Sequence, residues 1–157
     1  MNFSFQAVKN IKLIAGTSKI LSITDSYILE DQAKIQGQLL TLFGEPIFIT
    51  PDLEQVYQYV ILATDSNKNE YILSVYSGKR GPAIGGDNTP MTLDAAKQLR
   101  DYIHQAEPTD FEYEGYYIYR SIKITYKIEN GIITCTKTEI EGEELRKAYE
   151  KLGMTRI

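Results

Sequence analysis

The chain has 157 residues, of which 43% are hydrophobic and 24% are charged, and its formal net charge is −4 at pH 7. These values are typical of one globular domain and exclude a disordered or fibrous protein, so the sequence predicts a single domain over residues 1–157. No apolar run approaches the roughly 20 residues that span a bilayer, and the dispersed cations form no basic stripe of the kind that nucleic-acid binding needs. The N-terminal residues lack the pattern of a secretory signal, so we expect a cytoplasmic protein that binds neither membrane nor nucleic acid.

The first half of the chain predicts strands, a helix and a long hairpin. Short apolar stretches before residue 25 indicate one or two strands. Residues 30–46 have apolar side chains at helical spacing, and Gly37 within them costs about 1 kcal/mol relative to alanine, which is compatible with a close packing contact there. Residues 56–64 and 70–76 are rich in β-branched and aromatic side chains on both alternation phases. They predict a hairpin whose two strands are covered on both faces.

A glycine-rich segment follows this hairpin, at residues 77–88 (SGKRGPAIGGDN). Its four glycines predict a loop, but it matches neither of the two common phosphate-binding glycine motifs. One interpretation is that backbone N–H groups and cations of the loop hold an anion or a partner. The other is that the glycines only permit positive φ between a strand and a helix. The candidate contact residues are Tyr76, Lys79, Arg80, Gly85, Gly86 and Asp87.

The second half predicts two further helices and an antiparallel hairpin. Residues 92–108 have one apolar helical face, with Thr89 or Thr92 as the N-cap and Pro108 beyond the end. The alternating strand that starts near residue 111 reaches Asn130-Gly131, the strongest short hairpin signal. Residues 141–153 predict a third helix. The sequence therefore predicts an α+β fold, a single domain with an antiparallel β-sheet of about five to six strands and about three helices.

The residue types that usually carry catalysis or bind metals are sparse. His104 is the only histidine and Cys135 the only cysteine, so a zinc site built from His and Cys is excluded. No serine lies in a G-x-S-x-G motif. We therefore expect no catalytic set, no metal and no cofactor. Glu112 and Glu114, two residues apart, leave general acid/base chemistry or Mg²⁺ binding as a minor alternative.

Residues 110–119 (DFEYEGYYIY) alternate carboxylates with aromatic side chains. Tyrosine offers a large contact area, and neighbouring carboxylates pair with a partner's Lys or Arg, so this pattern suits protein recognition. The alternative is that the tyrosines are the core and rim of an ordinary sheet. The predicted partner-binding residues are Asp110, Glu112, Tyr113, Glu114, Tyr116, Tyr117 and Tyr119.

The order of LFGEP, a hairpin ending in LSVYSG, GPAIGGD before a helix, and then DFEYEGYY resembles small bacterial immunity proteins of polymorphic or contact-dependent toxin systems. The resemblance covers roughly residues 40–119. It implies a non-enzymatic inhibitor that plugs or covers a toxin domain, and the acidic surface favours a basic one. Contact residues vary among such proteins, so none is carried over.

We expect this inhibitor to be a monomer or homodimer. The alternative function is a small-molecule or anion-binding or hydrolytic domain that uses residues 77–88 and nearby carboxylates. An inhibitor should present a flat or convex acidic and aromatic patch. An enzyme should have a pocket that joins the glycine-rich segment to Glu112 or Glu114.

Overall fold

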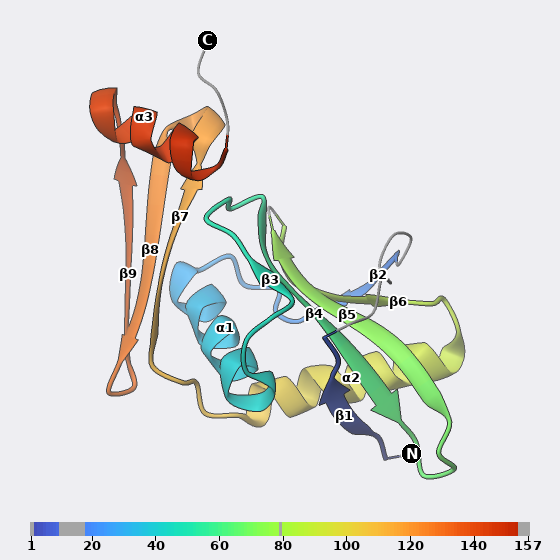
Figure 1. Cartoon of the computed structure of the whole chain (residues 1–157). Helices are drawn as coiled ribbons and strands as arrows, with labels where there is room; N and C mark the ends of the chain where they lie inside the picture. The colour runs from blue at the N-terminus through green and yellow to red at the C-terminus, as the bar shows by residue number, and fades with distance from the viewer. Residues whose placement is uncertain (1, 10–17, 79, 154–157) are drawn as a thin grey trace.

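The computed structural model describes residues 2–9, 18–78 and 80–153 of the chain. They form an α+β fold with three α-helices and two antiparallel sheets, which confirms the predicted class (Figure 1). In chain order the elements are β1 (Ser4–Ala7), β2 (Ser18–Ser22), α1 (Leu29–Phe43), β3 (Phe48–Ile49), β4 (Gln55–Thr64), β5 (Glu70–Gly78), β6 (Gly81–Gly86), α2 (Pro90–Gln105), β7 (Phe111–Tyr117), the 3-10 helix η1 (Ile118–Arg120), β8 (Ile122–Glu129), β9 (Ile132–Glu139) and α3 (Gly142–Lys151).

The strands divide between a six-stranded sheet and a three-stranded sheet, where the sequence predicted one sheet. The larger sheet has the order β1-β4-β5-β6-β2, with β3 also pairing with β4, and the smaller has the order β7-β8-β9. Helix α1 lies between the two sheets in Figure 1, and α2 runs along the larger one. One core cluster contains buried side chains of both sheets, among them Leu73 and Tyr126.

The long hairpin is formed as predicted, by β4 and β5. Its turn is held by Asp65, whose Oδ1 accepts hydrogen bonds of 2.9 Å from the backbone N–H groups of Asn67 and Asn69. Within β4, Val60 and Ile61 point to opposite faces and are both buried. This agrees with a central strand that is covered on both sides.

The predicted loop at residues 77–88 is wrong over most of its length, because Gly81–Gly86 form β6, which pairs with β5 and β2. A Cβ added at Gly86 would lie 3.0 Å from Thr92 Cγ2 and 3.2 Å from Leu73 Cδ2. Glycine at this position therefore lets α2 pack directly on the strand. Glycine is depleted in strands, so its abundance indicated a loop.

The C-terminal half follows the predicted pattern closely. Asn130 and Gly131 have φ of 54° and 78° between the paired residues Glu129 and Ile132, so they form the predicted two-residue turn, of type I′. Thr89 caps α2 by accepting a 3.2 Å hydrogen bond from the backbone N–H of Thr92. No helix within residues 2–9, 18–78 and 80–153 combines the length and apolar character needed to cross a membrane.

Candidate functional site

The tyrosines of the predicted partner-binding strand lie mostly inside the molecule. Tyr113 and Tyr116 are 7% and 4% exposed, and Tyr117 is half-buried. Tyr113 donates a 2.7 Å hydrogen bond to the backbone carbonyl of Thr50, which fixes its ring in the core. Tyr119, in η1, is 78% exposed and is the only one of the four that offers its ring to a partner.

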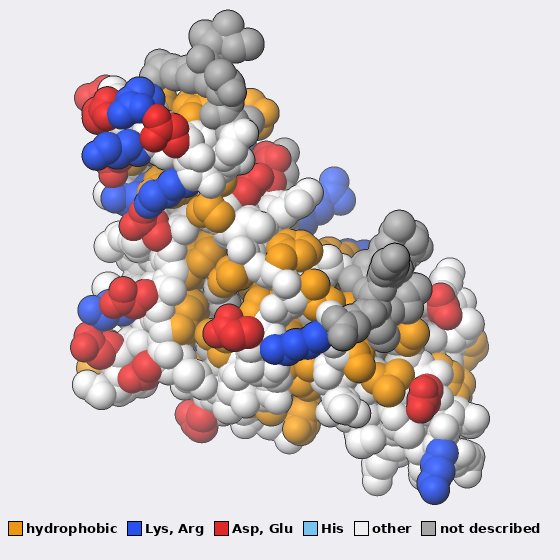
Figure 2. Space-filling view, viewed as in Figure 1, with side chains coloured by type: hydrophobic (Ala, Val, Ile, Leu, Met, Phe, Trp, Pro, Cys, Tyr) orange, Lys and Arg blue, Asp and Glu red, His pale blue; other side chains and the backbone are white. Residues whose placement is uncertain are grey.

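The carboxylates of the same strand are exposed but already have partners. Asp110 accepts hydrogen bonds of 2.8 and 3.3 Å from the backbone N–H groups of Asn130 and Gly131. Glu112 forms an ion pair with Lys127, at 3.4 Å between Oε1 and Nζ. Figure 2 shows charges of both signs intermixed on the side of the molecule formed by the three-stranded sheet and α3. These pairs reduce the net field that the strand presents to a partner.

Glu114 takes part in a local network that joins α3 to β7. Its carboxylate accepts a hydrogen bond from the Tyr116 hydroxyl and lies 3.4 Å from Lys151 Nζ. The hydrogen bond and then the lysine charge hold the pKa of Glu114 below its ordinary value. The Lys151 ammonium also lies 5.6 Å from the centre of the Tyr116 ring. Both the strand and its covering helix therefore depend on these three side chains.

The residues of the glycine-rich segment do not converge on one site. Tyr76 and Arg80 line a groove of about 660 Å³ on the outer face of the larger sheet. Gly85 shares this face, since a Cβ there would lie 3.3 Å from Tyr76 Cε1, whereas Gly86 faces α2. Asp87 is exposed in the connection between β6 and α2. Lys79 lies outside the described residues.

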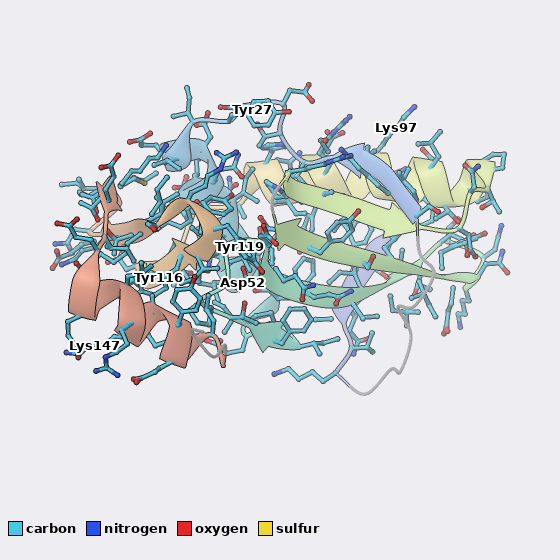
Figure 3. The ribbon with its side chains drawn as sticks, turned by 90° about the horizontal axis from the view of Figure 1, so that it is seen from above. Tyr27, Asp52, Lys97, Tyr116, Tyr119 and Lys147 are labelled. Atoms are coloured by element: carbon cyan, nitrogen blue, oxygen red, sulfur yellow. The ribbon has the colours of Figure 1, made fainter. Side chains whose placement is uncertain are left out.

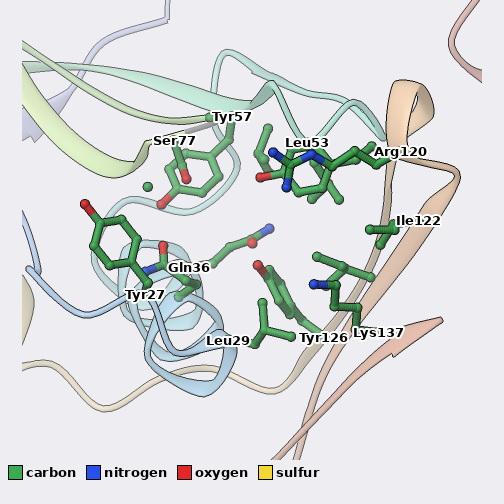
Figure 4. Close-up of a pocket in the computed structure, with 16 residues that line it drawn as sticks. Tyr27, Leu29, Gln36, Leu53, Tyr57, Ser77, Arg120, Ile122, Tyr126 and Lys137 are labelled. Carbon is green, nitrogen blue, oxygen red and sulfur yellow. The ribbon is translucent and has the colours of Figure 1, made fainter. Parts of the chain in front are cut away.

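A second cavity, of about 260 Å³, lies between the two sheets, and we call it the interlayer cavity. Figure 4 shows side chains from α1 and from both sheets turned toward it. Neither this cavity nor the outer groove reaches Glu112 or Glu114. The polar side chains that line it are Tyr27, Gln32, Gln36, Tyr57, Ser77, Tyr117, Arg120, Tyr126 and Lys137. Sequence reasoning missed this cavity, because its lining comes from segments far apart in the chain.

Two tyrosines that line the interlayer cavity or directly precede a lining residue are the most exposed aromatic side chains of the described residues. Tyr27 and Tyr119 are 85% and 78% exposed. Tyr27 and Arg120 line the cavity, and Tyr119 precedes Arg120 in the chain. Asp52 and Glu54 are the sequence neighbours of the lining residue Leu53, and Glu54 also lines the outer groove. We call the five residues Tyr27, Asp52, Glu54, Tyr119 and Arg120 the cavity rim. Seen from above in Figure 3, Asp52 and Tyr119 are labelled near the centre of the molecule and Tyr27 near its upper edge.

Local hydrogen bonds hold the rim in place. Ser26, next to Tyr27, accepts a 2.6 Å hydrogen bond from Gln32 Nε2 at its backbone carbonyl, which ties the segment before α1 to the helix. On the other side of the mouth, the backbone N–H of Tyr116 donates to Pro51 at 2.7 Å, and that of Leu53 donates to Tyr116 at 3.1 Å. The connection that carries Asp52 is therefore fixed to the end of β7.

The two residues with the most reactive side chains have structural surroundings. His104 Nε2 lies 2.6 Å from the backbone carbonyl oxygen of Ile23, which joins α2 to the segment after β2. Burial raises the pKa of the Cys135 thiol to about 11, so it stays protonated and weakly nucleophilic at neutral pH. Within the part of the chain that the structure describes, no three His, Cys, Asp or Glu side chains gather as metal ligands do.

Comparison of the chain with models of known protein families, with curated proteins and with solved structures gives no match. The functional argument therefore depends on the geometry of this molecule. Two features carry it: the exposed aromatic and charged rim, and the interlayer cavity beneath it.

Proposed function

We propose that this protein is a binding module that recognises a protein partner with a basic surface, as an inhibitor of the immunity type does. The observation that carries the proposal is the exposure of Tyr27 and Tyr119 at the cavity rim. Rigid tyrosine rings that protrude into solvent beside an arginine have the composition of the energetically dominant part of protein interfaces. We therefore propose that the partner binds at the cavity rim and not along the whole of residues 110–119, where the sequence predicted the binding surface.

The charge distribution supports a basic partner. Asp52 and Glu54 form no ion pair among the described residues, whereas Glu112 and Glu114 are paired with lysines. Unpaired carboxylates attract a cationic surface over a longer range than carboxylates that are already neutralised. The net charge of −4 acts in the same direction. We therefore expect the rim carboxylates to speed association more than the strand carboxylates do.

The first test replaces the rim aromatics. The candidate partner is the product of a toxin-like reading frame beside the gene or, where there is none, a basic protein captured from a lysate of the source cell. The Tyr27→Ser/Tyr119→Ser double variant should speed dissociation and cost about 2 kcal/mol or more of binding free energy. Ile132→Ser is the matched control, because Ile132 is 69% exposed but lies in the β8–β9 hairpin. Equal binding by the two variants would exclude the rim.

The second test compares two pairs of carboxylates that carry the same charge. Asp52→Asn/Glu54→Gln should slow association and flatten its dependence on salt. The asparagine keeps an oxygen for the 2.9 Å hydrogen bond that Asp52 accepts from the backbone N–H of Glu54. Glu112→Gln/Glu114→Gln should leave association closer to that of the parent. If Glu112→Gln/Glu114→Gln slowed association more than Asp52→Asn/Glu54→Gln, the interface would lie on β7 and not at the cavity rim.

A further inference from the structure

Gln36 presents a buried hydrogen-bond donor without a partner in the interlayer cavity. The residue is 4% exposed, it lines the cavity from α1, and its side-chain Nε2 has no hydrogen-bond partner. Leaving such a group unpaired costs roughly 1–3 kcal/mol, so native proteins rarely keep one without a bound molecule or a functional reason. Gln38 Oε1, outside the cavity lining, is a second buried atom without a partner, but only the Gln36 side chain belongs to the cavity. An acceptor atom of a bound molecule would pair the Gln36 donor once the buried amide turns toward it.

The rest of the polar lining can also donate hydrogen bonds: its hydroxyls and amides both donate and accept, whereas its two cations only donate. Among the residues that the structure describes, Arg120 and Lys137 are the charged side chains that line the cavity and no carboxylate does so, although the protein as a whole is acidic. Burial raises the pKa of Tyr57 and Tyr126, so both phenols remain protonated and able to donate. A cavity with two cations and several neutral donors favours an anion that carries more than one acceptor.

The volume and the apolar lining of the interlayer cavity limit the size and chemical type of the anion. The cavity volume of about 260 Å³ corresponds to about nine waters at roughly 30 Å³ each. It lies just below the roughly 300–1,000 Å³ of pockets for drug-sized ligands. Leu53, Val56 and Ile124 are among the apolar side chains that line the cavity together with the cationic residues and Gln36. A compact ligand with an apolar body suits this lining better than a bare inorganic ion.

We propose that the interlayer cavity binds a small carboxylate with an apolar body, whose carboxylate lies beside Arg120 and Lys137 and whose far end presents an acceptor to Gln36 Nε2. This site shares Ser77, Gly78 and Gly81 with the glycine-rich segment that the sequence left open as an anion site, but it uses neither Asp87 nor Gly85 and Gly86, and no described carboxylate lines it. It does not rest on the proposed protein partner, and its tests are made without one.

Three probes of one shape test the two ends of the site separately. The probe 4-hydroxybenzoate carries both the carboxylate and the distal acceptor, benzoate lacks the acceptor, and 4-hydroxybenzamide lacks the charge. Titrations at constant ionic strength follow the backbone amide signals of lining residues such as Tyr57 and Tyr126 in two-dimensional NMR spectra. We expect saturable binding of 4-hydroxybenzoate, with each of the other two probes weaker by about tenfold. Inorganic phosphate should bind more weakly still.

Variants assign each contact to its end of the ligand. Arg120→Gln and Lys137→Gln should remove the advantage of 4-hydroxybenzoate over 4-hydroxybenzamide, and Gln36→Leu should remove its advantage over benzoate. Lys127→Gln, on the same small sheet but outside the cavity, should change neither. Both Arg120 and Lys137 are exposed, so we expect their variants to fold. If Gln36→Leu does not fold, these two variants still test the proposed site.

Three outcomes would overturn this proposal. The absence of saturable shifts at millimolar probe would mean that the cavity holds water only. Equal affinities for 4-hydroxybenzoate and 4-hydroxybenzamide would exclude an anion site. Equal effects of the cavity variants and of Lys127→Gln would place any binding elsewhere. None of these outcomes bears on the protein interface, which the rim variants test.

Discussion

Two buried glutamines of α1 differ in what their side chains do. Gln38 Nε2 donates to the backbone carbonyls of His104 and Ala106, at 3.3 and 3.0 Å, and so ties α1 to the end of α2. Gln36 Nε2, two residues earlier, has no partner. Gln38 Oε1 is also buried without a partner, so the two residues differ in their donors and not in being fully satisfied. The Gln38 donor joins two helices, whereas the Gln36 donor has no partner and belongs to a residue that lines the cavity.

This contrast predicts opposite effects for the same substitution. Gln38→Leu should lower the free energy of unfolding by about 2 kcal/mol, because it removes two hydrogen bonds and leaves two helix-end carbonyls unsatisfied. Gln36→Leu should leave stability unchanged or raise it, because it removes an unpaired buried donor. Urea denaturation of both variants measures the difference. If Gln36→Leu costs as much as Gln38→Leu, the Gln36 side chain is structural and the cavity loses its main support.

At the scale of elements, the contact between α3 and β7 should depend on pH. The pKa of Glu114 is lowered in the folded protein, chiefly by the hydrogen bond from Tyr116 and then by Lys151. A group with a depressed folded pKa stabilises the fold above its unfolded pKa, and this contribution is lost as the pH falls through the folded value. The loss should therefore start near the ordinary value of 4.5 and continue below it.

The measurement is Tm as a function of pH for the parent and for Glu114→Gln. The parent should lose Tm more steeply than the variant as the pH falls below about 4.5, since the variant has no carboxylate to protonate. Glu112→Gln is the matched control, because Glu112 lies on the same strand and is paired only with the exposed Lys127. Parallel curves for the parent and Glu114→Gln would show that the network does not stabilise the fold.

The turn between β8 and β9 gives a prediction that depends on backbone geometry alone. Gly131 has a φ of 78°, and a Cβ there would meet no atom within 4 Å. Gly131→Val should therefore destabilise the fold by about 1–2 kcal/mol through the left-handed conformation and not through a clash. Gly131→Asn is the control, because asparagine tolerates that conformation. Equal melting curves for the two variants would contradict the type I′ assignment.

The elements that were predicted correctly are determined by residues within or next to the element itself. Asn130-Gly131 specifies its turn by φ preference, and Thr89 caps α2 by its own side chain, so neither needs knowledge of the rest of the chain. Strand β6, which was not predicted, depends on contacts with other elements of the fold. Its glycines are explained by contacts of Gly86 with Thr92 and Leu73, which no pattern within residues 77–88 encodes.

The candidate site shows the same limit. A strand pattern predicts that Tyr113 and Tyr119 share a face only while the strand continues. The chain turns into η1 after Tyr117, which leaves Tyr113 buried and Tyr119 exposed. The interlayer cavity brings Tyr27 and Gln36 together with Arg120, across more than 80 positions of the sequence. Spacing along the chain carries no signal for such a site.

At the scale of the whole molecule, the two sheets are joined at two places beside α1. The connection after β3 is bonded to β7 through Pro51 and Leu53. Near the middle of α1, the chain between α2 and β7 crosses the helix at Gly37, where the backbone N–H of Thr109 donates a 3.0 Å hydrogen bond to the Gly37 carbonyl. Gly37 directly follows the lining residue Gln36, so we expect the spacing of the two sheets at the cavity to depend on this close crossing.

Gly37 sets that spacing, so its substitution tests the arrangement of the two sheets. In a free helix, Gly37→Ala would stabilise by about 1 kcal/mol. Here the added Cβ would lie 2.8 Å from Pro108 Cβ and 3.0 Å from Ile128 Cδ1, so the crossing chain and the Ile128 side chain must shift. Because overpacking of this kind costs roughly 1–3 kcal/mol, we expect a net loss of stability in urea denaturation.

Lys34→Ala, at an exposed position of the same helix, is the control and should change the free energy of unfolding by no more than about 0.5 kcal/mol. The Gly37→Ala variant should also weaken binding of 4-hydroxybenzoate, because Gly37 follows the lining residue Gln36 and Ile128 packs from β8, which supplies Ile124 and Tyr126 to the cavity. A gain of about 1 kcal/mol in Gly37→Ala, with no change in ligand affinity, would mean that α1 and the chain that crosses it are not in contact and that the two sheets are not held at this distance.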